Sequence, residues 1–107
     1  MISQLEKLLG TPRDGALLRY SLGLEYAKSG DHARAAQYLR DAVERDPDYS
    51  AAWKMLGKSL AEGQRNEDAL AAFKQGIAAA HKKGDRQAEK EMSVFAKRLE
   101  KLGKKPG

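Results

Sequence analysis

The sequence predicts an all-α protein, arranged as a short solenoid of antiparallel helix pairs. Only three prolines occur in 107 residues, and the stretches between them are rich in Ala, Leu, Lys, Glu and Arg, which favour helix formation. No stretch of four to eight residues alternates β-branched or aromatic residues with polar ones, which is the pattern of a strand. A third observation, an internal repeat, predicts how the helices pack against one another.

The repeat becomes visible when the chain is shifted by 34 residues against itself. Ala16 then falls on Ser50, and Leu22-Gly23 falls on Leu56-Gly57. The positions that agree are apolar or small, whereas the polar positions differ. This pattern indicates a duplicated packing unit and not a duplicated chemical site. Further matched pairs are Ala27 and Ala61, Ala35 and Ala69, Tyr26 and Leu60, Leu39 and Phe73, Ala42 and Gly76, and Val43 and Ile77.

The first unit, residues 16–49, is predicted to be two helices whose apolar residues recur at three- and four-residue steps. Gly30 suits the left-handed position after the first helix, and Asp31 suits the N-cap of the second. The second helix is expected to stop before Pro47, because the residue before a proline disfavours helix. The inward-facing residues are Leu18, Leu22 and Tyr26, then Ala35, Leu39, Ala42 and Val43.

The second unit, residues 50–83, is predicted to repeat this arrangement, with a turn over residues 62–66. Its first helix is expected to pack through Trp53, Leu56, Gly57 and Leu60, and its second through Ala69, Phe73, Gly76 and Ile77.

Together the two units resemble the tetratricopeptide repeat, a helix–turn–helix unit of 34 residues, over about residues 16–83. Arg19 departs from the pattern where the second unit has Trp53, and His81 stands where a proline would close that unit. The resemblance implies a right-handed α-solenoid whose first helices line a concave groove for partner peptides or helices. The matching residues are Leu22, Gly23, Tyr26, Ala35, Ala42 and Pro47, then Trp53, Leu56, Gly57, Ala69 and Phe73.

Both flanks are predicted to cap the repeats, because each unit completes its core against a neighbour. Residues 1–10 are expected to be the second helix of a truncated preceding unit, with Thr11 as the N-cap and Pro12 in the first turn of the next helix. Residues 85–102 are expected to form a C-terminal capping helix. We therefore expect a single domain over residues 1–103 and a tail over residues 104–107. The water-facing side of the last helix is predicted to carry Arg86, Lys90, Glu91, Lys97, Arg98 and Lys101.

Gly57-Lys58-Ser59 has the letters that end a phosphate-binding P-loop, but its surroundings argue against one. A P-loop needs an earlier glycine, where Ala52 stands, and a loop between a strand and a helix. The equivalent Gly23 is followed by neither lysine nor a hydroxyl residue. We therefore interpret both glycines as close contacts between helices, and expect the small residues Ala35 and Ala69 to meet them.

The sequence predicts no enzyme, no cofactor and no metal site. There is no cysteine, and the two histidines, His32 and His81, are too far apart in sequence to show a metal-ligand spacing. Ser29, Asp31 and His32 lie too close along one turn for a nucleophile, a base and an orienting acid. Neither a signal peptide nor a long apolar segment is evident, so a cytoplasmic location is expected.

The most specific functional prediction is a groove that binds a peptide or helix of a partner protein. Its residues lie off the packing stripe of the two first helices and combine an aromatic ring, aliphatic groups and lysines. Such a surface favours an acidic segment with an apolar anchor, although the same residues are also ordinary on an exposed helix. The predicted groove residues are Leu17, Tyr20, Leu24 and Lys28, then Ala51, Lys54, Lys58 and Glu62.

An alternative function follows from the net charge of +5, much of which lies late in the chain. A basic accessory protein could bind nucleic acid through this Lys- and Arg-rich C-terminal end. No aromatic stacking platform is readable beside it, so the sequence favours a protein partner. The solenoid is expected to be a monomer or a weak homo-oligomer.

Overall fold

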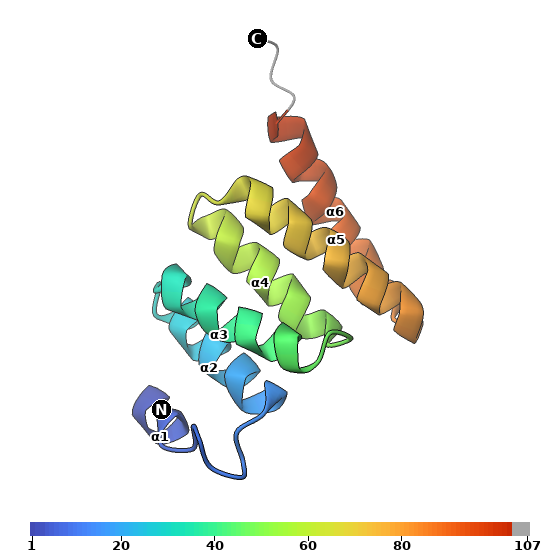
Figure 1. Ribbon diagram of the computed structural model, residues 1–107. Helices are drawn as coiled ribbons and strands as arrows, with labels where there is room; N and C mark the ends of the chain where they lie inside the picture. The colour runs from blue at the N-terminus through green and yellow to red at the C-terminus, as the bar shows by residue number, and fades with distance from the viewer. Residues whose placement is uncertain (104–107) are drawn as a thin grey trace.

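The computed structural model describes residues 1–103, and this part of the chain is all α-helical, as predicted (Figure 1). Within the same range, no helix combines the length and apolarity that crossing a membrane requires. The predicted tail, residues 104–107, lies outside the described residues. The helices are α1 (Ile2–Glu6), α2 (Ala16–Lys28), α3 (His32–Arg45), α4 (Ser50–Glu62), α5 (Asn66–Lys83) and α6 (Arg86–Gly103).

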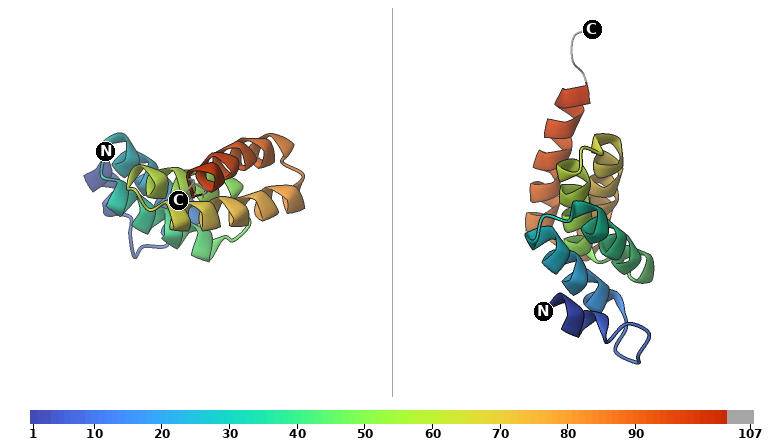
Figure 2. Two further views of the ribbon diagram at one scale, coloured as in Figure 1. Left: turned by 90° about the horizontal axis from the view of Figure 1, so that it is seen from above. Right: turned by 90° about the vertical axis from the view of Figure 1, so that its left-hand side faces the viewer.

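The helices form a solenoid of antiparallel pairs. Each helix packs against the next in the chain, and α4 also contacts both α2 and α6. In the right-hand view of Figure 2, α2, α4 and α6 follow one another along the molecule. These three helices make one layer, and α3 and α5 make the other. A ligand that lies across the first layer would therefore meet three helices in succession.

The predicted break between α2 and α3 is confirmed in detail. Gly30 has a φ of 84°, the left-handed conformation that suits glycine. The carboxylate of Asp31 accepts a hydrogen bond from the backbone N–H of Arg34 at 3.1 Å, which caps α3. α3 ends at Arg45, two residues before Pro47, as predicted.

The N-terminal helix is shorter than the predicted residues 1–10. α1 ends at Glu6, and residues 7–10 continue as turns. The N–H of Leu9 donates to the carbonyl of Glu6, three residues back and not four, so the regular α-helix is already lost there. Gly10 then redirects the chain with a φ of 77°.

Thr11 does not cap α2, contrary to the prediction. Its hydroxyl donates to the carbonyl of Leu8 at 2.5 Å and accepts from the N–H of Arg13 at 3.2 Å. Thr11 therefore stabilises the turn before α2. The helix begins at Ala16, after Gly15, and no side chain caps it.

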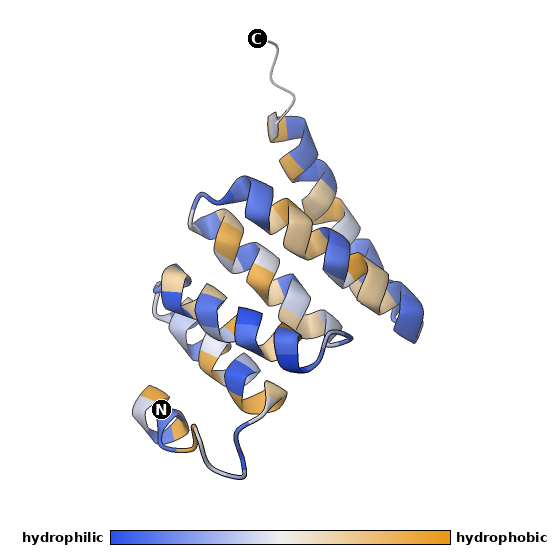
Figure 3. Ribbon diagram, in the orientation of Figure 1, coloured by the Kyte–Doolittle hydropathy of each residue, from blue (hydrophilic) through white to orange (hydrophobic). Residues whose placement is uncertain are grey.

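A row of large buried side chains runs through the solenoid, with one member from each of α2 to α6. Each is at most 1% exposed, and alanines fill much of the space around them. Burying one such side chain is worth about 1.5–3 kcal/mol. The hydropathy colours alternate along the helices in Figure 3, as amphipathic packing requires. The members of this row, called the spine below, are Leu22, Leu39, Leu56, Phe73 and Met92.

The repeated glycines lie directly against the spine. A Cβ atom on Gly23 would lie 2.5 Å from the side chain of Leu39, and one on Gly57 would lie 2.6 Å from the ring of Phe73. The side chains nearest to the two glycines are thus Leu39 and Phe73, which lie four residues after the expected neighbours Ala35 and Ala69. Each glycine makes room for a large side chain of the partner helix.

The turn between α4 and α5 differs from its counterpart at one residue. Gln64 lies 34 positions after Gly30 and has a φ of 65°, in the left-handed region. A side chain in this conformation costs roughly 1–2 kcal/mol, a cost that Gly30 avoids. The second turn is thus built with the same geometry but a less suitable residue.

We expect Gly57→Ala to destabilise the protein by about 1–3 kcal/mol, because the new methyl group would overlap the buried Phe73 ring. Helix propensity alone would favour alanine by about 1 kcal/mol. Urea unfolding followed by circular dichroism measures the net effect. The matched control is Gly63→Ala, whose Cβ would make only ordinary contacts at 3.4 Å and beyond. Equal stability of the two variants would contradict this interpretation.

We expect Gln64→Gly to stabilise the protein by about 1 kcal/mol, because it relieves the left-handed conformation. Gly30→Gln should have the opposite effect at the equivalent position. Thermal melts of the two variants test the pair together. A loss of stability in Gln64→Gly would contradict this expectation. It would show that the Gln64 side chain stabilises the fold by more than the left-handed backbone conformation costs.

Candidate functional site

The predicted groove residues lie on α2 and α4, the first helices of the two units. Residues 34 positions apart occupy equivalent places in these helices, as Leu24 and Lys58 do. The repeated geometry therefore presents the two sets on the same side of the layer. The equivalent pairs are Leu17 with Ala51, Tyr20 with Lys54, Leu24 with Lys58, and Lys28 with Glu62.

The α2 side of this surface is apolar. Leu17 is 70% exposed, which is unusual for a large aliphatic side chain. Tyr20 and Leu24 are half-buried, and the ring of Tyr20 packs on that of Tyr49 with centroids 4.9 Å apart. Tyr49 immediately precedes α4 and was not among the predicted groove residues. An aromatic pair thus stands between the two helices.

The two lysines of α4 have different surroundings. The Nζ atom of Lys54 lies 3.4 Å from a carboxylate oxygen of Glu91 in α6, so its charge is already paired. The Nζ atom of Lys58 lies 5.7 Å from the centroid of the Phe95 ring. Lys58 is exposed and has no carboxylate within 4 Å among residues 1–103. Lys58 therefore has a charge available to a ligand.

α6 forms a third wall of the surface, which the sequence analysis did not predict. Glu91 and Arg98 are exposed, as expected, but Glu91 holds Lys54 and the guanidinium of Arg98 lies 5.9 Å from the Phe95 ring. The sequence did hold a signal for this role. The four-residue spacing of Ala52, Leu56 and Leu60 recurs 36 residues later in Ala88, Met92 and Ala96.

The remaining two predicted residues lie at the ends of their helices. Lys28 is the last residue of α2 and approaches Glu25 to 4.0 Å. Glu62 is the last residue of α4, is exposed, and has no cationic partner within the described range 1–103. These two side chains bring opposite charges to the same end of the surface.

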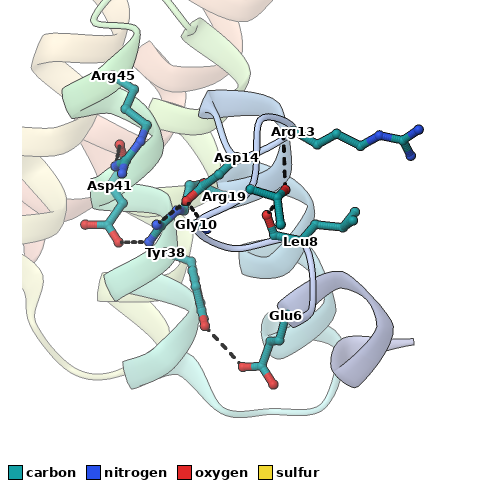
Figure 4. A network of polar contacts seen from close by, with 10 residues as sticks. Glu6, Leu8, Gly10, Arg13, Asp14, Arg19, Tyr38, Asp41 and Arg45 are labelled. Carbon is teal, nitrogen blue, oxygen red and sulfur yellow. Dashed lines mark hydrogen bonds and ion pairs between the residues drawn. The ribbon is translucent and has the colours of Figure 1, made fainter.

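Arg19 anchors α2 at the position where the second unit has Trp53 (Figure 4). Its Nε and Nη2 atoms each donate to the carboxylate of Asp14 at 2.9 Å, and its Nη1 atom donates to Asp41 of α3 at 3.0 Å. Asp14 also accepts from the N–H of Gly10 at 2.9 Å. The arginine thus joins two helices and the preceding loop, where a tryptophan would join them by packing.

This network shifts the titration of its members. The hydrogen bonds from Arg19 and from the N–H of Gly10 hold the pKa of Asp14 well below its usual range. The bond to Asp14 raises the pKa of Arg19 above its ordinary value. Both groups are therefore charged at neutral pH, and the ion pair is maintained.

Glu6 fixes α1 to the first unit through two tyrosines. Its carboxylate accepts hydrogen bonds from the hydroxyls of Tyr26 at 2.8 Å and Tyr38 at 3.1 Å. The two rings stack with centroids 5.6 Å apart. The bond to Glu6 is the main cause that raises the pKa of Tyr26, whereas burial is the main cause for Tyr38. Figure 4 shows Glu6 facing Tyr38.

The described residues contain no cluster of side chains that could hold a metal ion. Phe95 is the aromatic residue of the basic helix α6, and its ring stacks on Phe73 with centroids 5.3 Å apart. One of its faces is therefore covered. Of the basic C-terminal end, Lys97 and Lys101 are exposed, while Lys104 and Lys105 lie outside the described residues.

Comparisons with known proteins point to one family. The family model for the tetratricopeptide repeat matches residues 20–83. TPR repeat-containing protein PA0015 of Pseudomonas aeruginosa is 48% identical over 101 residues, which cover 94% of this chain and 96% of that protein. The solution structure of protein BPP2914 from Bordetella parapertussis has a TM-score of 0.80 at 40% identity, covering 95% of this chain and 89% of that one.

A more distant structure shows the same fold. The crystal structure of the Sgt2 TPR domain from Aspergillus fumigatus has a TM-score of 0.73 at 21% identity, and the match covers 99% of this chain and 72% of that chain. At this level of identity the likeness concerns the fold alone.

We expect Asp14→Asn to destabilise the protein at neutral pH and to lose that effect in acid. A lowered pKa stabilises the fold fully above the ordinary Asp value of about 3.9, and the contribution declines below that value until it is lost as the pH falls through the lowered pKa. The difference in melting temperature between the wild type and the variant should therefore be constant above about pH 5 and shrink steadily as the pH falls from about 4 toward 2. Asp68→Asn is the control, because Asp68 is exposed and pairs only within its own turn. A difference that does not change with pH would contradict the assignment.

Proposed function

The chain belongs to the tetratricopeptide repeat family, and on that premise we propose that it binds a segment of a partner protein across α2, α4 and α6. Proteins of this family are generally interaction modules without catalysis. The proposed ligand is an acidic segment with an apolar anchor. We call this surface the concave surface below, and it consists of Leu17, Tyr20, Leu24, Lys28, Tyr49, Ala51, Lys54, Lys58, Glu62, Glu91, Phe95 and Arg98.

The observation that carries this proposal is the position of Lys58. The side chain is exposed and free of any ion pair in the described residues, and its Nζ atom lies 5.7 Å from the centroid of the Phe95 ring. Leu24, at the equivalent place in α2, supplies an apolar neighbour. A carboxylate of the ligand would meet the lysine, and an adjacent apolar side chain would cover Leu24 or Phe95.

Lys54 has a different role in this proposal. Because it is paired with Glu91, it adds a contact between α4 and α6 at this surface. Reversing its charge would place two carboxylates together at this contact. A double reversal of Lys54 and Lys58 would therefore disturb α6 as well as the ligand, so Lys58 alone is the sharper test.

Binding of nucleic acid through the basic α6 is the alternative, but the helix lacks an open aromatic ring on which bases could stack. Phe95 has one ring face against Phe73 and cations at 5.7 and 5.9 Å, so it does not offer an open platform for bases. The proposal therefore retains a protein partner.

We expect Lys58→Glu to weaken binding of an identified partner segment about tenfold at low salt, since it removes an attraction and adds a repulsion. The partner is first captured from native lysate and identified by mass spectrometry. The binding segment of that partner is then titrated by calorimetry against the wild type, Lys58→Glu and a control variant.

The matched control is Lys74→Glu, because Lys74 is exposed on α5 in the other layer and makes the same charge change. Unchanged melting of Lys58→Glu shows that the fold is intact. Equal affinities of the two variants would place the ligand elsewhere.

A further inference from the structure

α6 has the pattern of the first helix of a third unit. Its buried Ala88 and Met92 follow the spacing of Ala52 and Leu56, and the residue after Met92 is Ser93, where the first two units have glycine. In those units the glycine face receives the second helix of the same unit. Within residues 1–103, no helix packs on α6 at this place.

A hollow of about 580 Å³ lies there, on the side of α6 away from the concave surface. On α6, residues 91, 95 and 98 belong to the concave surface, whereas residues 86, 90, 93 and 97 line the hollow. The spacing puts these two sets on different faces of the helix, more than a quarter turn apart around its axis. The residues that line it are His81, Arg86, Glu89, Lys90, Ser93, Val94 and Lys97.

The charge of this hollow is positive and largely unpaired. Arg86, Lys90 and Lys97 have no carboxylate within 4 Å among the residues that the structure describes. The one acidic residue of the lining, Glu89, lies 3.3 Å from the Nδ1 atom of His81. Three cations thus face solvent along one side of a helix, where a carboxylate-bearing ligand would satisfy them.

The hollow also has features of a helix-packing surface. Val94 is 48% exposed and offers an apolar contact. Ser93 is small, and its hydroxyl donates to the carbonyl of Glu89 at 2.8 Å, so its side chain is directed along its own helix. A neighbouring helix could therefore approach α6 closely, as α5 approaches α4 at Gly57.

We propose that this outer face of α6 binds an acidic amphipathic helix of a partner protein, which takes the place of the second helix of a third unit. Carboxylates spaced four and seven residues apart on that helix would meet Arg86, Lys90 and Lys97. A small apolar residue between them would cover Val94. A second copy of this chain is a poor occupant, because both faces would be basic and the chain has a net charge of +5.

The test uses a synthetic helical peptide with glutamates at these spacings around an alanine and a leucine. Its control has the same composition with the glutamates moved to the opposite face. We expect fluorescence anisotropy to show binding of the first peptide only. The triple variant Arg86→Glu, Lys90→Glu, Lys97→Glu should bind it at least tenfold more weakly. The matched control reverses the charges of Lys7, Arg13 and Lys74, which are exposed away from this face, and it should bind the peptide as the wild type does.

Ser93→Trp keeps every charge and should still abolish binding, because the indole would block the approach of a helix. If that variant fails to fold by circular dichroism, Val94→Gln serves instead and should weaken binding about threefold. Lys58→Glu should leave this peptide unaffected, which separates the outer face from the concave surface.

Three results would overturn the proposal. The first is equal binding of the two peptides. The second is binding of a 20-nucleotide single strand that Ser93→Trp does not change, which would indicate attraction of phosphates by charge alone. The third is concentration-dependent dimerisation that Ser93→Trp removes, which would assign the face to a second copy of this chain.

Discussion

The contact of Phe73 with Gly57, and its counterpart between Leu39 and Gly23, is the constraint on which this structure depends. In each pair a large side chain of one helix enters the space left by a missing Cβ atom on its neighbour. The two helices therefore approach closely and in a fixed register. Dispersion contacts fall off steeply with distance, so a separation imposed by a methyl group would loosen the spine on both sides. A mid-helix glycine costs about 1 kcal/mol of helix stability relative to alanine. The close packing offsets this cost at both Gly23 and Gly57.

Close packing within each pair determines how α2, α4 and α6 line up in one layer. Because α2 and α4 repeat the same geometry, their outward residues align, and Leu24 stands beside Lys58 in the arrangement. α6 packs on α5 through Met92, which lies against Gly76, and it contacts α4 of this layer through the ion pair of Glu91 with Lys54. The surface is therefore rigid where the spine supports it. Its charges are carried by long side chains, which can reorient without any change of the core.

The two ends of the solenoid are closed by different chemistry. At the N-terminal end, Arg19 replaces a packing tryptophan and binds Asp14 and Asp41, while Glu6 holds two tyrosines. At the C-terminal end, α6 presents lysines and an arginine where a further helix would pack. An apolar partner at either end would leave these polar groups buried and unsatisfied. The same polarity is the basis of the selectivity for an acidic helix that we propose for the C-terminal end.

The sequence by itself determined the helices, their pairing and most of the spine, because a period of 34 residues and a 3.6-residue repeat of apolar positions are local patterns. Leu17, Tyr20, Leu24 and Lys58 could be assigned to one surface for the same reason. Only the tertiary structure decided which side chains meet across helices. It put the Phe73 ring against Gly57, ended α1 at Glu6, and placed Tyr49, Glu91 and Phe95 beside the predicted groove residues. Such contacts depend on the distance and rotation between helices, which no local pattern specifies, because side chains far apart in the chain fix them by filling the same space.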